Sequence, residues 1–223
     1  MHVHLPKPLH GWREFAGEVG IIVLGVIIAL AFGQMAEASQ WRQEVRTARA
    51  SIHREMASDL AVFADRLRIA HCVDRHLADA QQRIDAVAET GKTPAENANM
   101  ESPGQMILLG DYEAQQTAQN LVHFPPAELS ALGVFYDQVR FMREWNETED
   151  SAWNELALLS AGNARLGAFD VALLRRDLQV ARNYEVLTVL NARRQVERGR
   201  ELGVAPGPSK ARYLGYMCKP AAG

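Results

Sequence analysis

Cys72 and Cys218 are the only two cysteines in this chain of 223 residues, and their thiols are its most reactive side chains. Cys72 lies within a helical pattern, whereas Cys218 lies in a final segment with little periodicity. A disulfide between them would close a long loop and stabilise the domain by roughly 2–4 kcal/mol in an oxidising compartment. We therefore expect Cys72 and Cys218 to be bonded in a periplasmic domain, with two free cytoplasmic thiols as the alternative.

The spacing of histidines and cysteines does not predict a metal site. Cys72 and His76 are four residues apart and share a helix face, but two ligands do not make a site. No CxxC or HExxH motif completes one. His71 is next to Cys72 in sequence and is expected to point elsewhere. We expect no metal ion and no other cofactor.

Four carboxylates cluster on a predicted helix, at Glu144, Glu147, Glu149 and Asp150. They lack the E-x-x-H pairs that bind di-iron centres in helical bundles. Walker, GxGxxG, GxSxG and protein-kinase motifs are also absent from the sequence. We interpret the acidic cluster as a solvated helix face, and we expect no catalytic residues and no enzymatic activity.

The elements behind these residues are organised around the apolar stretch Phe15–Ala36. A helix rises about 1.5 Å per residue, so roughly 20 apolar residues cross a hydrocarbon core of about 30 Å. Phe15–Ala36 reaches that length with one charge, Glu18, and is flanked by Trp12 and Trp41, whose indole rings favour the headgroup level. The pattern predicts a transmembrane helix. A signal peptide cleaved at Ala36-Glu37-Ala38 is the alternative.

One face of this predicted span carries small residues. Gly25, Ala29 and Gly33 recur every four residues, and Ile22 and Glu18 extend the line towards the start of the span. Small residues at this spacing let helix backbones approach closely in lipid, and a carboxylate near the interface usually faces a partner, water or headgroups. We predict that this face contacts another membrane helix. The alternative is that Gly and Ala are simply common in such helices.

A long amphipathic pattern follows from Trp41 to Ala88. Its apolar positions recur at steps of three and four, and they include Leu60, Phe63, Leu67, Ala70 and Val73. Successive steps of four near its start resemble a coiled-coil stutter. Because no Gly or Pro lies between Gly33 and Gly91, we expect the span to continue into this helix as a stalk, with Gly91 capping its end.

Basic residues lie on both sides of the span. Arg42, Arg46 and Arg49 share one face beside the membrane and could contact anionic headgroups, each for about 1 kcal/mol, or simply be solvated. Lys7 and Arg13 precede the span, so charge alone does not decide the orientation. The expected disulfide instead carries the periplasmic assignment. A net charge of −3 gives no basic field for nucleic acid.

The rest of the chain reads as helices without a strand pattern. We expect a second helix at about Met106–Val122, a third beginning at Pro125-Pro126 and bent or broken at Asn146–Asp150, and a last one from about Asp170 to Leu202. The core of the second helix is expected at Ile107, Leu108, Ala114, Ala118, Leu121 and Val122. Together these helices predict an all-α, up-and-down bundle over residues 37–202, with tails at 1–14 and 203–223.

The run Phe15-x2-Glu18-x6-Gly25-Val26-x2-Ala29-Leu30, followed by Trp41-Arg42, resembles a widespread family of bacterial single-span membrane proteins. The similarity is specific over about residues 12–90, and a late cysteine and the end at Leu202-Gly203-Val204 look similar too. The resemblance implies an uncleaved anchor in front of an all-helical domain. It brings no assigned activity, substrate or catalytic residue.

These observations predict a bacterial inner-membrane protein with one span and a helical periplasmic domain. We expect it to act as a scaffold or accessory subunit, through helix contacts with further copies of itself or with another membrane protein. A periplasmic ligand-sensing bundle is the alternative and would need a polar pocket between helices. A secreted helical protein, with its signal peptide removed, is the weaker one.

Overall fold

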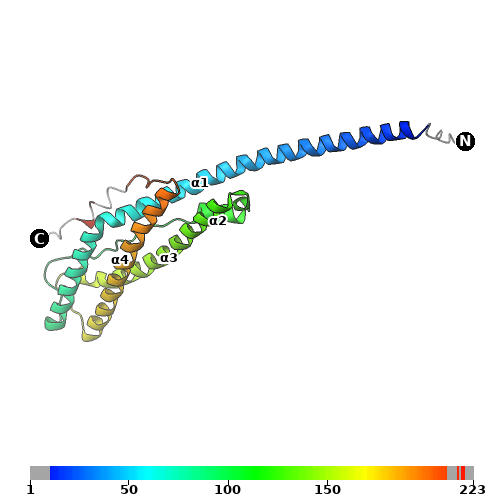
Figure 1. Ribbon diagram of the computed structural model, residues 1–223. Coiled ribbons are helices and arrows are strands. Elements are labelled where there is room, and N and C mark those ends of the chain that lie inside the picture. Colours follow the sequence, from blue (N-terminus) through cyan, green and yellow to red (C-terminus); the bar gives the residue numbers. More distant parts are fainter. Residues whose placement is uncertain (1–10, 210–214, 216, 219–223) are drawn as a thin grey trace, which may run out of the picture. The chain divides into compact units, whose positions relative to one another are not determined.

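The computed structural model describes residues 11–209, 215, 217 and 218, with only the backbone of Arg13 and Glu14. These residues are 80% helical and contain no strand, and four α-helices pack against each other (Figure 1). The predicted all-α class is therefore confirmed. The helices are α1 (Trp12–Thr90), α2 (Gly110–Thr117), α3 (Pro126–Leu156) and α4 (Ala168–Glu201), with short 3-10 helices at Asn120–His123 and Ala157–Leu159. Most of both predicted tails lies outside the described residues.

The chain forms two compact units, a first ending at Thr47 and a second beginning at Ala48. In the first unit every side chain from Phe15 to Gln40 is exposed. The exposed apolar residues include Ile21 at 75% and Leu24 at 58%. This part of α1 is long and apolar enough to cross a membrane, and none of its most apolar stretch is buried. It is a candidate membrane span.

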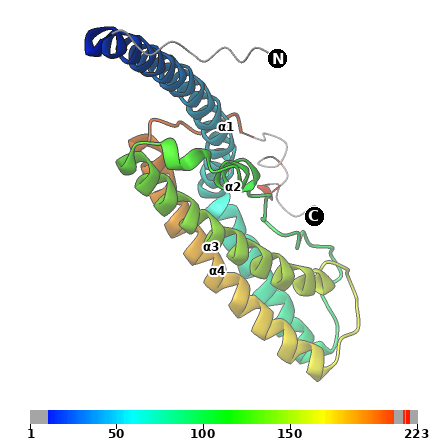
Figure 2. The ribbon, with the colours of Figure 1, turned by 90° about the vertical axis from the view of Figure 1, so that its right-hand side faces the viewer.

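The second unit has a continuous apolar core between α1, α3 and α4, which lie side by side in both ribbon views (Figures 1 and 2). α4 runs antiparallel to α3: Gln195 Nε2 donates to the carbonyl of Phe135, whereas Glu149 and Glu185 come together farther along the pair. Trp153 is the largest fully buried side chain of the core. Burying one such large apolar side chain contributes about 1.5–3 kcal/mol.

The loop after α1 and the turn between α3 and α4 are joined by hydrogen bonds. Gly91 ends α1 with φ +71°, a left-handed conformation that glycine adopts without strain, and its N–H bonds to Val87 O at 2.8 Å. Thr93 N then donates to Ala164 O at 2.9 Å. The predicted glycine cap is confirmed, as are the start of α3 at Pro126 and an end of α4 just before Leu202.

The predicted second helix is wrong in extent. α2 covers only Gly110–Thr117, because residues 106–109 lie outside regular secondary structure and the Leu108 N–H donates to Asp59 instead of within a helix. Part of the expected core is consequently exposed, at Leu108, Ala114, Ala118 and Val122, and Leu109 and Tyr112 are buried instead. The break expected at Asn146–Asp150 is also wrong, since α3 continues through these residues to Leu156.

Candidate functional site

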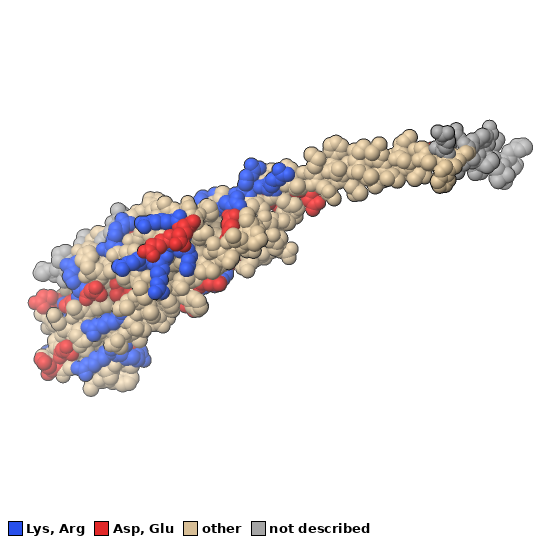
Figure 3. Space-filling view, viewed as in Figure 1, with Lys and Arg blue, Asp and Glu red and all other residues tan. Residues whose placement is uncertain are grey.

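The five residues of the predicted membrane contact face all lie on the exposed part of α1. Glu18, Ile22, Gly25, Ala29 and Gly33 are each exposed. A Cβ atom added at Gly25 or Gly33 would meet nothing within 4 Å, so no other described part of the chain approaches these glycines. In the space-filling view this length of α1 carries almost no charged side chains (Figure 3). The face is accessible to a helix from another chain.

The aromatic residues that flank the predicted span differ in their surroundings. Trp12 is 79% exposed and contacts only the ring of Phe15 among the interactions described for it, with centroids 6.2 Å apart. Trp41 is half-buried, and its indole N–H donates to Glu37 at 3.4 Å. Both indoles lie on α1, one on each side of the predicted span, and their contact with headgroups stays a prediction.

The three arginines proposed to contact headgroups do not behave alike. Arg42 and Arg46 are exposed. Arg49 belongs to the second unit, where its Nε and Nη2 donate to the two carboxylate oxygens of Glu128 at 2.6 and 2.8 Å. This bidentate bond raises the pKa of Arg49 and joins α1 to α3. A headgroup contact is therefore best carried by Arg42 and Arg46.

A buried cluster of charges joins three helices of the second unit. Arg66 of α1 donates from Nη2 to Glu149 of α3 and to Glu185 of α4. All three side chains are buried, with Glu149 at 0% exposure. Burial raises the pKa of Glu149 and raises that of Glu185 to about 7, while Arg66 opposes both shifts. One guanidinium thus serves two carboxylates, and burial favours a proton on one of them.

Glu149 was expected in a solvated acidic face, and that expectation is wrong. The sequence signal that could have identified the cluster is the position of Arg66 within the apolar pattern of α1, not the number of charged residues. Arg66 lies three residues after Phe63, and the buried face of α1 continues through Arg66 and Ile69 while Leu67 and Ala70 are only half-buried. A charged residue at a core position of an amphipathic pattern therefore indicates a buried partner of opposite charge.

A second carboxylate pair on α1 holds the segment that leads into α2. Glu55 accepts the backbone N–H groups of Asp111 and Tyr112 at 2.6 and 3.1 Å, and Asp59 accepts that of Leu108 at 2.9 Å. Glu55 thereby caps the N-terminus of α2, where free N–H groups and the helix dipole favour a negative charge. We call Glu55 and Asp59 the α2 clamp.

Asp59 is the less satisfied member of the α2 clamp. Its Oδ2 atom is buried without a hydrogen-bond partner among the residues that the structure describes. Burial raises the pKa of Asp59 to about 8, the Leu108 N–H lowers it, and the nearby charge of Glu55 raises it further. The same buried surroundings raise the pKa of Tyr136, whose hydroxyl donates to Ile52 O at 3.4 Å. Burial of the clamp therefore favours the protonated form of Asp59.

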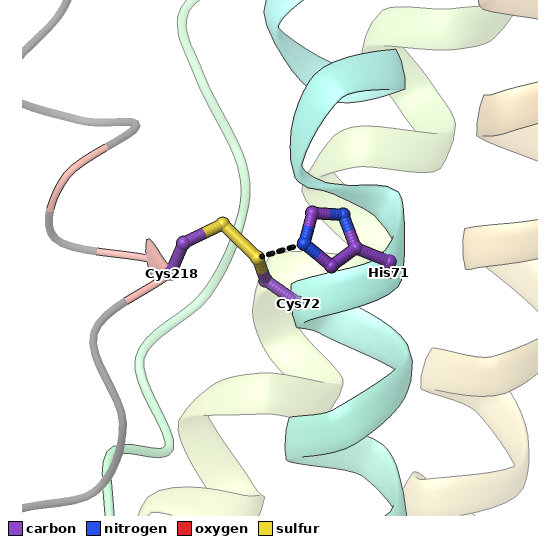
Figure 4. A group of neighbouring side chains, drawn as sticks. All are labelled: His71, Cys72 and Cys218. Carbon is purple, nitrogen blue, oxygen red and sulfur yellow. Dashed lines mark hydrogen bonds between the residues drawn. A yellow bond between two sulfur atoms is a disulfide. The ribbon is translucent and has the colours of Figure 1, made fainter.

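The two cysteines are joined in the structure by a disulfide, with Cα atoms 5.2 Å apart. His71 Nε2 lies 3.2 Å from Cys72 Sγ, so the expectation that His71 points elsewhere is wrong (Figure 4). His76, the other histidine considered as a ligand, instead donates from Nε2 to the carbonyl of Met217 at 2.9 Å. The structure thus brings His71, Cys72 and Cys218 together and gives His76 a separate structural bond.

Two hollows flank the irregular segment of residues 104–109. The larger, about 590 Å³, is lined by this segment and by polar residues of α3. Several of its polar groups are bonded: Arg143 donates to Glu147 at 3.3 Å, and Asn146 accepts the Gln105 N–H at 3.3 Å. The side-chain oxygen of Gln105 is buried without a hydrogen-bond partner among the described residues. The smaller, about 370 Å³, lies along α1 between Arg54 and Asp65. In the larger hollow, the bond between Asn146 and Gln105 holds the segment against α3.

Comparisons of the chain with protein-family models, with curated proteins and with solved structures find no match. The resemblance to single-span bacterial proteins therefore stays a prediction from the sequence.

Proposed function

We propose that the protein is a non-enzymatic, single-pass protein of the bacterial inner membrane that acts as a scaffold or accessory subunit. Its domain would be an up-and-down helical bundle in the periplasm. The observation that best supports this proposal is the apolar surface of Phe15–Ala36, which is exposed on every side of α1. Exposed apolar surface costs roughly 25 cal/mol per Å² in water, so a patch of this extent calls for lipid or a partner.

The proposed contact is made through the face formed by Glu18, Ile22, Gly25, Ala29 and Gly33. Gly25 and Gly33 supply the space that a neighbouring helix backbone needs, since nothing in the described chain fills it. Glu18 adds a charge on the same side, which is costly at a membrane interface unless it meets water, headgroups or a polar partner. The partner is a second copy of the chain or another membrane protein.

The periplasmic orientation is supported by the Cys72–Cys218 disulfide. Disulfides persist in the periplasm, whereas cytoplasmic thiols are kept reduced. A reporter enzyme that is active only in the periplasm, fused after Gly223, should be active. Finding both thiols free in protein isolated without reductant would remove this support.

Sensing of a ligand by the domain is a second candidate function, and the hollow beside residues 104–109 favours it. Part of its polar lining is already engaged, since Arg143 bonds to Glu147 within α3 and Asn146 of α3 accepts the Gln105 N–H. The hollow therefore supports sensing less than the exposed apolar surface supports anchoring and association.

The contact face is tested by exchanging small residues for leucine. Gly25→Leu and Gly33→Leu should each abolish copurification of a stoichiometric partner, or the dimer seen by light scattering in mild detergent. Ala31→Leu is the matched control, because Ala31 lies two residues from Ala29 and Gly33 and so faces the opposite side. A complex that survives both glycine substitutions would overturn the proposed interface.

Retention of the anchor is tested by the intact mass of the protein extracted from membranes. The full chain is expected. Loss of residues 1–38 would instead establish cleavage after Ala38, and the secreted alternative would replace the anchored one.

A further inference from the structure

An imidazole lies against the only disulfide of the chain. His71 Nε2, Cys72 Sγ and Cys218 Sγ all lie within 4.8 Å of one another (Figure 4). Two of these residues are on α1 and the third comes from a segment 146 residues farther along the chain. Neither anchoring nor helix association uses this cluster. Two sulfurs and one imidazole nitrogen are, however, a common ligand set for zinc.

The spacing of the three atoms suits a tetrahedral ion once the sulfur–sulfur bond is opened. Zinc–sulfur bonds of about 2.3 Å and zinc–nitrogen bonds of about 2.0 Å place neighbouring ligand atoms roughly 3.5–3.8 Å apart. The distance from His71 Nε2 to Cys72 Sγ is 3.2 Å, close to that value. The two sulfurs need to separate to the same spacing once their bond is opened.

The segment that carries Cys218 has further attachments to α1. Met217 is 1% exposed and belongs to the apolar core of the second unit. Its carbonyl accepts a hydrogen bond from His76 Nε2 at 2.9 Å. Reduction of the disulfide therefore leaves the residue before Cys218 anchored, and both thiols stay beside His71. Such preorganisation lowers the entropic cost of binding an ion.

We propose that, after the Cys72–Cys218 disulfide is reduced, His71, Cys72 and Cys218 bind one Zn²⁺ ion, with water in the fourth position. A dithiol supplies the two electrons and two protons that convert the disulfide to two thiols, and is itself oxidised to a disulfide. Zn²⁺ then displaces both thiol protons and takes the lone pair of His71 Nε2. Because His71 is exposed and Cys218 half-buried, the ion has a path from solvent.

Disulfide and zinc would be alternative ways to tie Cys218 to α1. The disulfide does so under oxidising conditions, and the ion does so when the thiols are reduced. A bound ion would also withhold both sulfurs from reoxidation. The proposal does not depend on the anchoring function, since it concerns residues of the second unit alone.

The test uses the full chain in detergent, reduced with a dithiol that is then removed without air. Zn²⁺ titrated against a chromogenic chelator should bind one equivalent more in reduced than in oxidised protein. This difference cancels any ion held by the N-terminal histidines, which need no reduction. Co²⁺ in place of Zn²⁺ should give the absorption bands of tetrahedral thiolate coordination.

His71→Ala is the decisive variant because it keeps the disulfide, so its fold can be verified by circular dichroism before reduction. It should weaken Zn²⁺ binding at least about tenfold. His123→Ala, an exposed histidine outside the cluster, is the matched control and should bind normally. Equal uptake by oxidised and reduced protein, unchanged affinity in His71→Ala, or loss of the fold on reduction would each overturn the proposal.

Discussion

Gly25 and Gly199 both stand on long helices, but the space around them differs between the two units. A Cβ atom at Gly199 of α4 would collide with the side chain of Leu60, which is fully buried on α1. At Gly25 the same added atom would meet nothing within 4 Å. Beside Gly199 the chain itself occupies the space, although the helical Gly133 of the same unit also meets nothing within 4 Å. In the first unit that space is open, which is what an interface with another chain requires.

Charges repeat this difference along the single helix α1. Arg66 is buried in the second unit and bonded to carboxylates of two other helices. Glu18 is exposed in the first unit. The fold supplies the surroundings of Arg66, whereas no described part of the chain covers Glu18. Substitutions that change folding stability should therefore lie in the second unit, and those that change association should lie in the first.

The largest effect is expected from Arg66→Met. Removing the guanidinium leaves Glu149 and Glu185 buried without a counter-charge, which should lower the free energy of unfolding by about 3–5 kcal/mol. Denaturant titration of the full chain in detergent, followed by tryptophan fluorescence, measures the change. Glu18→Gln is the control in the first unit and should leave the transition unchanged. A loss below about 1 kcal/mol in Arg66→Met would mean that the buried cluster contributes little.

Gly199→Ala should be the next most damaging change. The added methyl group overpacks the contact with Leu60, at a cost of typically 1–3 kcal/mol. The double variant with Leu60→Ala should lose less stability than the sum of the single variants, because the shortened side chain makes room. Gly25→Ala should not change the unfolding transition at all. Strict additivity of Gly199→Ala and Leu60→Ala would contradict the close contact.

Stability should fall as the pH rises from 5 to 8. Asp59, with a pKa of about 8, and Glu185, with a pKa of about 7, keep protons in the folded state that they lose in the unfolded chain. Folding therefore binds protons in this range, and the free energy of unfolding decreases with pH. We expect a decrease of at least about 1.4 kcal/mol, the equivalent of one pKa unit.

Asp59→Asn removes one of these two titrating groups and should flatten the pH profile of unfolding. The exposed Asp137, changed to Asn, serves as a control that should leave the profile unchanged. A profile that rises from pH 5 to 8 in the unmodified chain would contradict the raised pKa values. It would mean that salt-bridged carboxylates, whose protonation destabilises the folded state, contribute more to the pH dependence than Asp59 and Glu185 do.

Local signals explain which parts of the fold were predictable. Proline at the start of α3 and Gly91 at the end of α1 act within one turn of the backbone, so their positions could be read directly. The extent of α2 could not be predicted in this way, because the Leu108 N–H donates to Asp59, which lies 49 residues earlier. Contacts of that sequence separation leave no periodic trace in the segment itself.

The candidate sites divide along the same line. The proposed membrane contact face rests on a repeat of small residues within one helix, and it stays a prediction from the sequence. The buried cluster of Arg66, Glu149 and Glu185 was missed because each residue alone is typical of a solvated surface. The spacing of Arg66 indicates a buried partner of opposite charge, but only the meeting of three helices shows that Glu149 and Glu185 are those partners.

The smallest effect is expected at the boundary of the two units, where Arg46 of the first unit and Arg49 of the second stand three residues apart on α1. Arg49→Ala removes a half-exposed ion pair with Glu128, so the free energy of unfolding should fall by about 0.2–1 kcal/mol, and less at high salt. Arg46→Ala should leave unfolding unchanged and instead weaken the contact with anionic lipid by about 1 kcal/mol. Lipid exchange on the reconstituted chain, comparing anionic with zwitterionic vesicles, measures that contact. If Arg49→Ala altered lipid preference and Arg46→Ala altered unfolding, the boundary between the two units would not separate folding from association.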